Sequence, residues 1–156
     1  MKKHLFISGP TSVDERVKKA LLHDDISHRD TEFEELFSST QELLLNAVNA
    51  DKRIYTSLLT AGSGTSAVEA MISSFLPKSS VLVLSNGAFG DRLYNMTKVF
   101  KCNSKFLDYE WGKEYLLDDI EKIFRENLQI ENVLTCWVET STGVLNPIDE
   151  LSVLCQ

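Results

Sequence analysis

The spacing of hydrophobic and polar residues changes near residue 50. Before it, apolar side chains recur every three or four positions, which predicts amphipathic helices. Ser12-Val13-Asp14-Glu15 and Thr31-Glu32-Phe33-Glu34 both have the spacing of a capping box, in which the first and fourth residues bond each other's backbone N–H groups. We therefore expect a short helix capped by Ser12 and a long one over about Thr31–Ala50, capped by Thr31.

From Ile54 onward, short runs rich in β-branched and apolar residues alternate with segments of helical period. The expected strands are Ile54–Ala61, Val81–Ser85, Ser104–Tyr109 and Val133–Glu139. The expected helices are Ser66–Leu76, Ala88–Phe100 and Leu116–Asn127. This alternation predicts an α/β fold with a mostly parallel sheet flanked by helices. Asn146 and Pro147 have the residue types of an N-cap and a first helical position, so a last helix should begin there.

Composition narrows the class of partner. The 156 residues are 43% hydrophobic and 25% charged, which suits one globular core, and the net charge is -7. Proteins that bind nucleic acid or anionic membranes cluster Lys and Arg instead. We therefore expect small-molecule partners, with no nucleic acid and no membrane.

The cysteines and the first residues bear on the compartment. Cys102, Cys136 and Cys155 have no C-x-x-C spacing and an odd count, so neither a metal site nor a disulfide framework is predicted. The apolar run Leu5–Ile7 is much too short for a signal peptide or a membrane span. These features favour a cytoplasmic protein with reduced thiols.

A glycine-rich loop provides the first chemical signal. Gly62-Ser63-Gly64-Thr65 lies between an expected strand and an expected helix. Two glycines let the backbone approach a ligand, free N–H groups point outward at a helix start, and two hydroxyls add donors. The loop therefore suits a phosphate.

Other interpretations of the loop stay open on these residues alone. The pattern Gly62-x-Gly64-x-x-Ala67 also satisfies a dinucleotide-binding fingerprint, although the acid expected at the end of the second strand is replaced by Ser85-Asn86. A Walker loop is excluded because no Gly-Lys-Ser/Thr follows. A plain glycine turn between strand and helix is the third possibility.

Two further segments follow expected strands at the edge where α/β proteins bind ligands. Asn86–Arg92 places Phe89 between glycines, where its ring could lie flat on a planar ligand or simply pack in the core. Glu139–Gly143 offers hydroxyls to a polar ring edge, or forms a Ser/Thr-rich turn.

Taken together, these motifs resemble the class V branch of the fold-type I pyridoxal-phosphate enzymes over almost the whole chain. The segments that carry the resemblance are Ser8–Thr11, Ser27–Phe33, the loop at residues 62–65, Asn86–Arg92 and Glu139–Glu150. The amino-acid sequences of the last two segments are most similar to those of 2-aminoethylphosphonate:pyruvate transaminases, with alanine:glyoxylate and serine:glyoxylate aminotransferases close behind. The resemblance implies the large domain of a transaminase with pyridoxal 5'-phosphate as cofactor, an amino donor and a 2-oxo acid as substrates, and a homodimer when complete.

The resemblance also assigns residues to roles. Ser63, Gly64 and Thr65 would hold the cofactor phosphate, and Phe89 would stack on the pyridine ring. Thr140 would contact the cofactor near its phenolic oxygen, and Gly9 would lie at the substrate mouth. Residues 1–50 would form an arm and helices at the dimer surface and active-site mouth, and 51–156 an incomplete cofactor-binding domain.

The chain departs from the family in one respect. The family's aspartate opposite the pyridine nitrogen and its Schiff-base lysine come after the region matched here, and the last lysine of this sequence, Lys122, precedes the fourth expected strand. No catalytic residue and no metal ligand can therefore be assigned. We expect this chain alone to be inactive, and an alternative is a catalytically dead chain that acts only as a binding partner.

Overall fold

The computed structural model describes residues 4–126 and 129–156. The chain forms two compact units, Met1–Ala61 and Gly62–Gln156. None of the helices in the described residues is long and apolar enough to cross a bilayer.

The first unit contains α1 (Glu15–Ala20) and α2 (Thr31–Ala47) joined by irregular segments. The capping prediction for α1 is wrong, because Asp14 accepts the Arg16 N–H at 2.8 Å while the Ser12 hydroxyl accepts from Leu5. In α2 the N-cap position is Asp30, one residue before the expected Thr31.

The long helix also ends earlier than Ala50. Asn49 adopts a left-handed conformation with φ 53°, and the Ala50 N–H turns back to the carbonyl of Leu45 at 2.9 Å. Such a reversal satisfies carbonyls at a helix end and stops the helix.

The strand expected over Ile54–Ala61 is absent. The N–H groups of Ile54 and Tyr55 both bond the Asp51 carbonyl at 2.9 Å, which makes a turn, and the Gln41 side chain donates to the Ser57 carbonyl at 2.6 Å. The side chains of Ile54, Tyr55 and Leu58 are exposed. An apolar run becomes a strand only when a neighbouring strand takes up its backbone groups, and none of the described strands does so here.

The second unit keeps the predicted alternation from Gly64 onward. Its elements are α3 (Gly64–Phe75), β1 (Ser80–Ser85), α4 (Ala88–Val99), β2 (Asn103–Asp108), α5 (Leu117–Glu126), β3 (Asn132–Leu134), β4 (Val138–Glu139), β5 (Val144–Leu145) and α6 (Ile148–Leu154). Asn127, expected as the last residue of the α5 helix, lies outside the described residues. The α/β fold class with parallel strands and flanking helices is confirmed.

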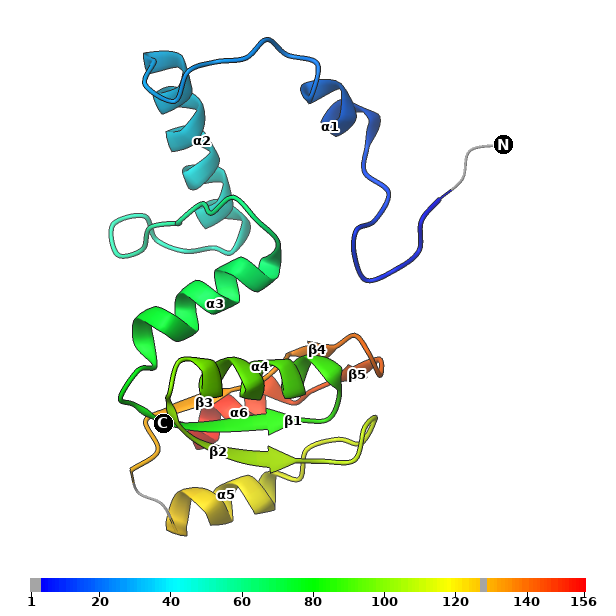
Figure 1. Cartoon of the computed structure of the whole chain (residues 1–156), viewed down its shortest axis with the longest axis vertical. Coiled ribbons are helices and arrows are strands. Elements are labelled where there is room, and N and C mark those ends of the chain that lie inside the picture. Colours follow the sequence, from blue (N-terminus) through cyan, green and yellow to red (C-terminus); the bar gives the residue numbers. More distant parts are fainter. Residues whose placement is uncertain (1–3, 127–128) are drawn as a thin grey trace. The chain divides into compact units, whose positions relative to one another are not determined.

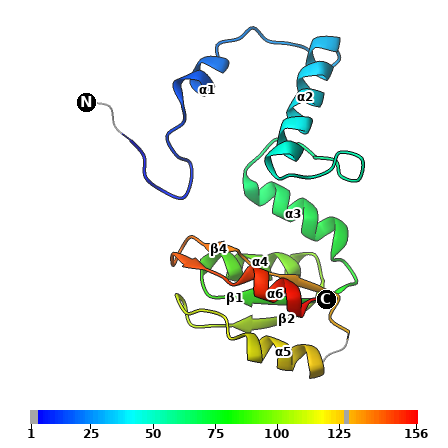
Figure 2. The same ribbon diagram turned by 180° about the vertical axis from the view of Figure 1, so that it is seen from behind.

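Strand β1 is the centre of a parallel sheet of order β2-β1-β3. Val81 and Val83 belong to one core cluster, with residues of α3 and α4, while Leu82 and Leu84 belong to another with α5 and α6. Figures 1 and 2 show α4 on one face of β1 and α6 on the opposite face. Because both faces are covered, the strand reads as a continuous apolar run.

The fourth expected strand is divided. After β3 ends at Leu134, the Thr135 hydroxyl lies 2.9 Å from that of Tyr115, and the Cys136 carbonyl accepts the Asn146 side chain at 2.8 Å. β4 then pairs antiparallel with β5 in a separate hairpin. The N-cap expected at Asn146 is misplaced, because its side chain is buried and bonds the Cys136 carbonyl while Pro147 takes the N-cap position of α6.

Candidate functional site

The predicted site residues of the second unit lie on three segments: the start of α3, the junction of β1 and α4, and the turn after β4. The Arg92 guanidinium of α4 donates to the Thr65 hydroxyl of α3 at 3.3 Å. The Ala88 N–H of α4 donates to the Ser141 hydroxyl after β4 at 3.0 Å. The structure therefore links all three segments through α4, at the carboxyl end of β1.

The start of α3 presents unoccupied donors. Ser63 stands at the N-cap position without a side-chain cap, and in the described residues the N–H groups of Gly64 and Thr65 have no acceptor. Gly62 has φ 153°, and a Cβ there would lie 2.4 Å from the Ser66 hydroxyl. Only glycine fits this turn, which leaves an exposed helix start suited to an anion.

The start of α4 is different, because the protein supplies its own anion. The Glu139 side chain is fully buried and accepts the N–H groups of Gly90 at 3.0 Å and Phe89 at 3.2 Å. The Ser141 hydroxyl donates to the same carboxylate at 2.5 Å. Glu139 thus fills the α4 terminus, a role that the sequence alone did not reveal.

Burial opposes the charge of Glu139, and hydrogen bonds favour it. Desolvation raises the pKa of this carboxyl, but the Ser141 hydroxyl and the N–H groups of Gly90, Ser141 and Phe89 outweigh it and hold the pKa below its ordinary value. Donors aimed at a carboxylate stabilise its ionised form. A charged Glu139 is therefore a fixed component of the α4 terminus.

The side chain of Phe89 is 40% exposed, in the first turn of α4. It belongs to neither core cluster of the described residues, so the alternative that it is core packing loses its support. Arg92 lies three residues on, a spacing that places two side chains on one face of a helix. Phe89 thus lies on the same side of α4 as Arg92, which contacts Thr65.

The other two predicted positions are both exposed. Thr140 lies in the turn after β4, between Glu139 and Ser141. Gly9 lies in an irregular segment of the first unit, joined to Pro10 by a cis peptide bond.

The amide side chains of Asn86 and Asn146 form a buried hydrogen-bonded pair at this end of the sheet. Asn86 donates to the Asn146 side chain at 2.8 Å and to the Lys113 carbonyl at 2.7 Å. It follows β1 directly, in the place where a dinucleotide site carries an acid. Its side chain is fully used within the protein.

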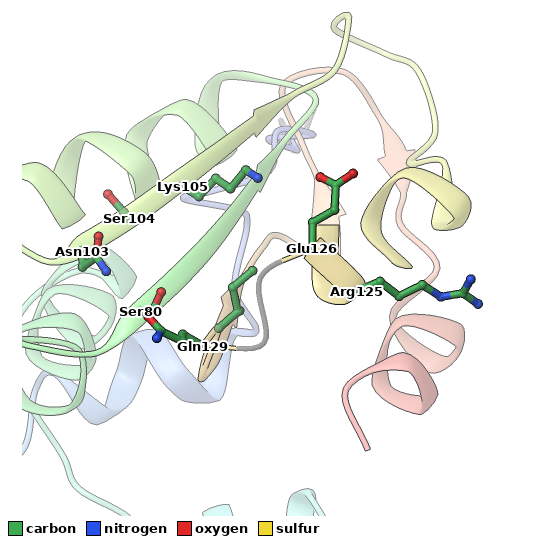
Figure 3. A pocket seen from close by; sticks show the side chains of 8 residues that line it. Ser80, Asn103, Ser104, Lys105, Arg125, Glu126 and Gln129 are labelled. Atoms are coloured by element: carbon green, nitrogen blue, oxygen red, sulfur yellow. The ribbon is translucent and has the colours of Figure 1, made fainter. Parts of the chain in front are cut away.

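The pocket drawn in Figure 3 lies at the opposite end of the sheet, where strands β1 and β2 begin. Its volume is about 650 Å3, and Ser80 and Asn103, the first residues of β1 and β2, line it. Ligands of open α/β sheets bind at the carboxyl ends of the strands, so we place no site there. The described residues also hold no group of three His, Cys, Asp or Glu that could bind a metal.

Comparison with known proteins bears on the family and the fold. No profile of a protein family matches the chain. A 2-aminoethylphosphonate–pyruvate transaminase of Phocaeicola vulgatus is 30% identical over 154 residues, which are 97% of this chain and 42% of the relative. The structure of an aspartate aminotransferase from Thermus thermophilus superposes with a TM-score of 0.83 and 28% identity, over 94% of this chain and 40% of that one.

Over the part of their length that it spans, the chain is similar to aminotransferases of class V. An alanine–glyoxylate aminotransferase from Nostoc also superposes, with a TM-score of 0.82 and 26% identity over 94% of this chain and 38% of that chain. The chain spans 42% of the length of the curated aminotransferase quoted above. The fold prediction, a part of a fold-type I large domain, is confirmed at this level.

Proposed function

We propose that this chain is the cofactor-holding part of a pyridoxal-phosphate-dependent aminotransferase. The observation that carries the proposal is the contrast between two neighbouring helix starts. The N–H groups of Gly64 and Thr65 are open to a ligand, whereas those of Phe89 and Gly90 are satisfied by Glu139. An open terminus that contacts α4 through Arg92 and Thr65, together with the exposed Phe89 ring in the first turn of α4, suits a ligand with one phosphate and one flat ring.

The residues present fit this cofactor. Ser63, Gly64 and Thr65 offer two N–H groups and two hydroxyls to the phosphate, at the positive end of the α3 dipole. Phe89 offers an exposed ring face to the pyridine, and Thr140 a hydroxyl to the phenolic oxygen. Pyridoxal phosphate, when bound, supplies the electron sink for transamination. The chain's own residues bind and orient it.

The amino donor in this proposal is 2-aminoethylphosphonate and the acceptor is pyruvate. The support is the name of the curated relatives, which match over 97% of this chain. An alanine- or serine:glyoxylate pair is the alternative, supported by the alanine–glyoxylate aminotransferase among the structural neighbours. The proposal includes a cytoplasmic homodimer in which residues 1–50 form the arm and 51–156 part of the cofactor domain.

The dinucleotide interpretation of Gly62-x-Gly64-x-x-Ala67 has less support. The Asn86 side chain, at the end of the central strand, bonds Lys113 and Asn146 instead of facing outward to a ribose. The second helix start, at α4, is closed to another phosphate by Glu139. A ligand with a single phosphate therefore fits these residues better.

We expect no transaminase activity from a polypeptide of these 156 residues alone. Transamination needs a lysine that bonds the cofactor and moves a proton at the substrate carbon. Lys122 lies on α5, whose side chains pack against the sheet face opposite α4. We assign no lysine of this chain to that role, and a chain that serves only as a binding partner remains the second candidate.

Titration of the 156-residue chain tests the cofactor assignment. Pyridoxamine 5'-phosphate is the suitable probe, because its amine cannot form imines with surface lysines. We expect saturable binding that weakens in Thr65→Ala, with no change in the control Ser73→Ala at the far end of the same helix. Tighter binding of NADH than of pyridoxamine 5'-phosphate, or equal loss in both variants, would refute the assignment.

A further inference from the structure

The buried carboxylate of Glu139 touches both sides of the proposed ring site. On one side it accepts the N–H groups of Phe89 and Gly90, at 3.2 and 3.0 Å. On the other it accepts the Ser141 hydroxyl at 2.5 Å and the Ser141 N–H at 3.2 Å. Thr140 lies between Glu139 and Ser141. The backbone of the residue expected to stack on the ring and the turn that carries the residue expected to bond its edge are thus held by one side chain.

Further contacts fix that side chain. The Ser141 hydroxyl accepts the Ala88 N–H at 3.0 Å, which closes a loop of bonds between the turn after β4 and the first turn of α4. A Cβ on Gly87 would lie 2.5 Å from Cγ of Glu139, so the backbone packs directly on the carboxylate stem. A fully buried carboxylate with this many charge-assisted bonds has little freedom to move.

Resting on the proposed function, we infer that Glu139 is a positioning residue for the pyridine ring. It sets the distance between the Phe89 face and the Thr140 hydroxyl by tying the α4 start to the turn after β4. It does not touch the start of α3, where the phosphate is proposed to bind. Loss of its charge should therefore weaken recognition of the ring and leave recognition of the phosphate unchanged.

The test compares two probes on the full 156-residue chain: pyridoxamine 5'-phosphate and inorganic phosphate. In Glu139→Gln the side chain keeps its shape but presents an amide NH2 to backbone donors. We expect affinity for pyridoxamine 5'-phosphate to fall about tenfold, the equivalent of one hydrogen bond, with no change in phosphate affinity. Glu150→Gln, an exposed acid on α6, is the matched control and should bind both probes as the unmodified chain does.

Amide hydrogen exchange at Gly90 checks the contact itself and should accelerate in Glu139→Gln. If that variant does not fold, Ser141→Ala replaces it, since it removes the hydroxyl that bonds both Glu139 and the Ala88 N–H. Equal affinities of the unmodified chain and the folded variant for pyridoxamine 5'-phosphate would overturn the inference, as would a parallel loss of phosphate affinity. Failure of the unmodified chain to bind pyridoxamine 5'-phosphate would refute the proposed function, and the inference with it.

Discussion

Replacing Gly90 with alanine should separate α4 from the central strand. Gly90 is buried, and a Cβ there would lie 2.6 Å from Cα and 2.7 Å from Cβ of Ser85. Ordinary van der Waals contact begins at 3.4 Å, so helix and strand must move apart by most of an ångström. One of the atoms met is backbone of β1, which cannot rotate away as a side chain would.

The expected cost follows from two opposing effects. Overpacking a buried contact destabilises by about 1–3 kcal/mol, and a backbone clash belongs at the upper end. Alanine in place of glycine inside a helix returns up to about 1 kcal/mol. The net loss in the free energy of unfolding should be about 1–2 kcal/mol, with part of it arising from a lengthened bond between the Gly90 N–H and Glu139.

Urea unfolding followed by circular dichroism measures this loss. The midpoint of Gly90→Ala should fall by about 1 M relative to the unmodified chain. Gly64→Ala is the matched control, because it adds the same methyl group near a helix start where nothing lies within 4 Å. An unchanged midpoint in Gly90→Ala, or an equal fall in both variants, would refute the reasoning.

Three further outcomes follow from the same geometry. Because the pKa of Glu139 is held below its ordinary 4.5, its contribution to stability is complete above about that pH and is lost as the pH falls through the lower folded-state value. The difference in unfolding free energy between the unmodified chain and Glu139→Gln should therefore shrink in acid, and a difference independent of pH would contradict this. Phe89→Ala should weaken pyridoxamine 5'-phosphate binding about tenfold, while Phe89→Tyr preserves it; an equal loss in the exposed control Phe75→Ala would argue against stacking. The isolated chain should self-associate in sedimentation, because the outer edge of β3 pairs with none of the described strands, and a monodisperse monomer with a cooperative high-temperature transition would show otherwise.

The elements that the sequence predicted well are those whose surroundings can be inferred from the local pattern of apolar and polar residues. β1 is apolar on both faces because helices cover both, so its continuous run Val81–Leu84 could be recognised without knowing its neighbours. Helix α4 follows from its apolar period and from the glycines around Phe89. The same glycines lead us to expect a ring site at the carboxyl end of β1, and that expectation stays a prediction.

The errors arose where a distant partner decides the local structure. Ile54–Ala61 has the composition of a strand but lacks a pairing strand among the described residues. Asn146 has the residue type of an N-cap, yet its side chain bonds Asn86, sixty positions away. In the sequence, Glu139 is one residue of a predicted turn motif, and no local pattern shows that its side chain bonds the start of α4. In the sequence, Arg92 likewise stands out only as part of a motif, although it is the residue that contacts Thr65.

The contact between Gly87 and Glu139 also constrains how this protein can change during evolution. Gly87 leaves no room for a side chain because the carboxylate stem fills that space, and Ser141 is the third member of the same contact. A substitution at any one of these positions disrupts the contact that constrains the other two, although Gly87 lies some fifty residues before Glu139 and Ser141 in the chain. We therefore expect Gly87, Glu139 and Ser141 to be inherited together or replaced together, so that lineages with a different residue at 139 also differ at 87 and 141.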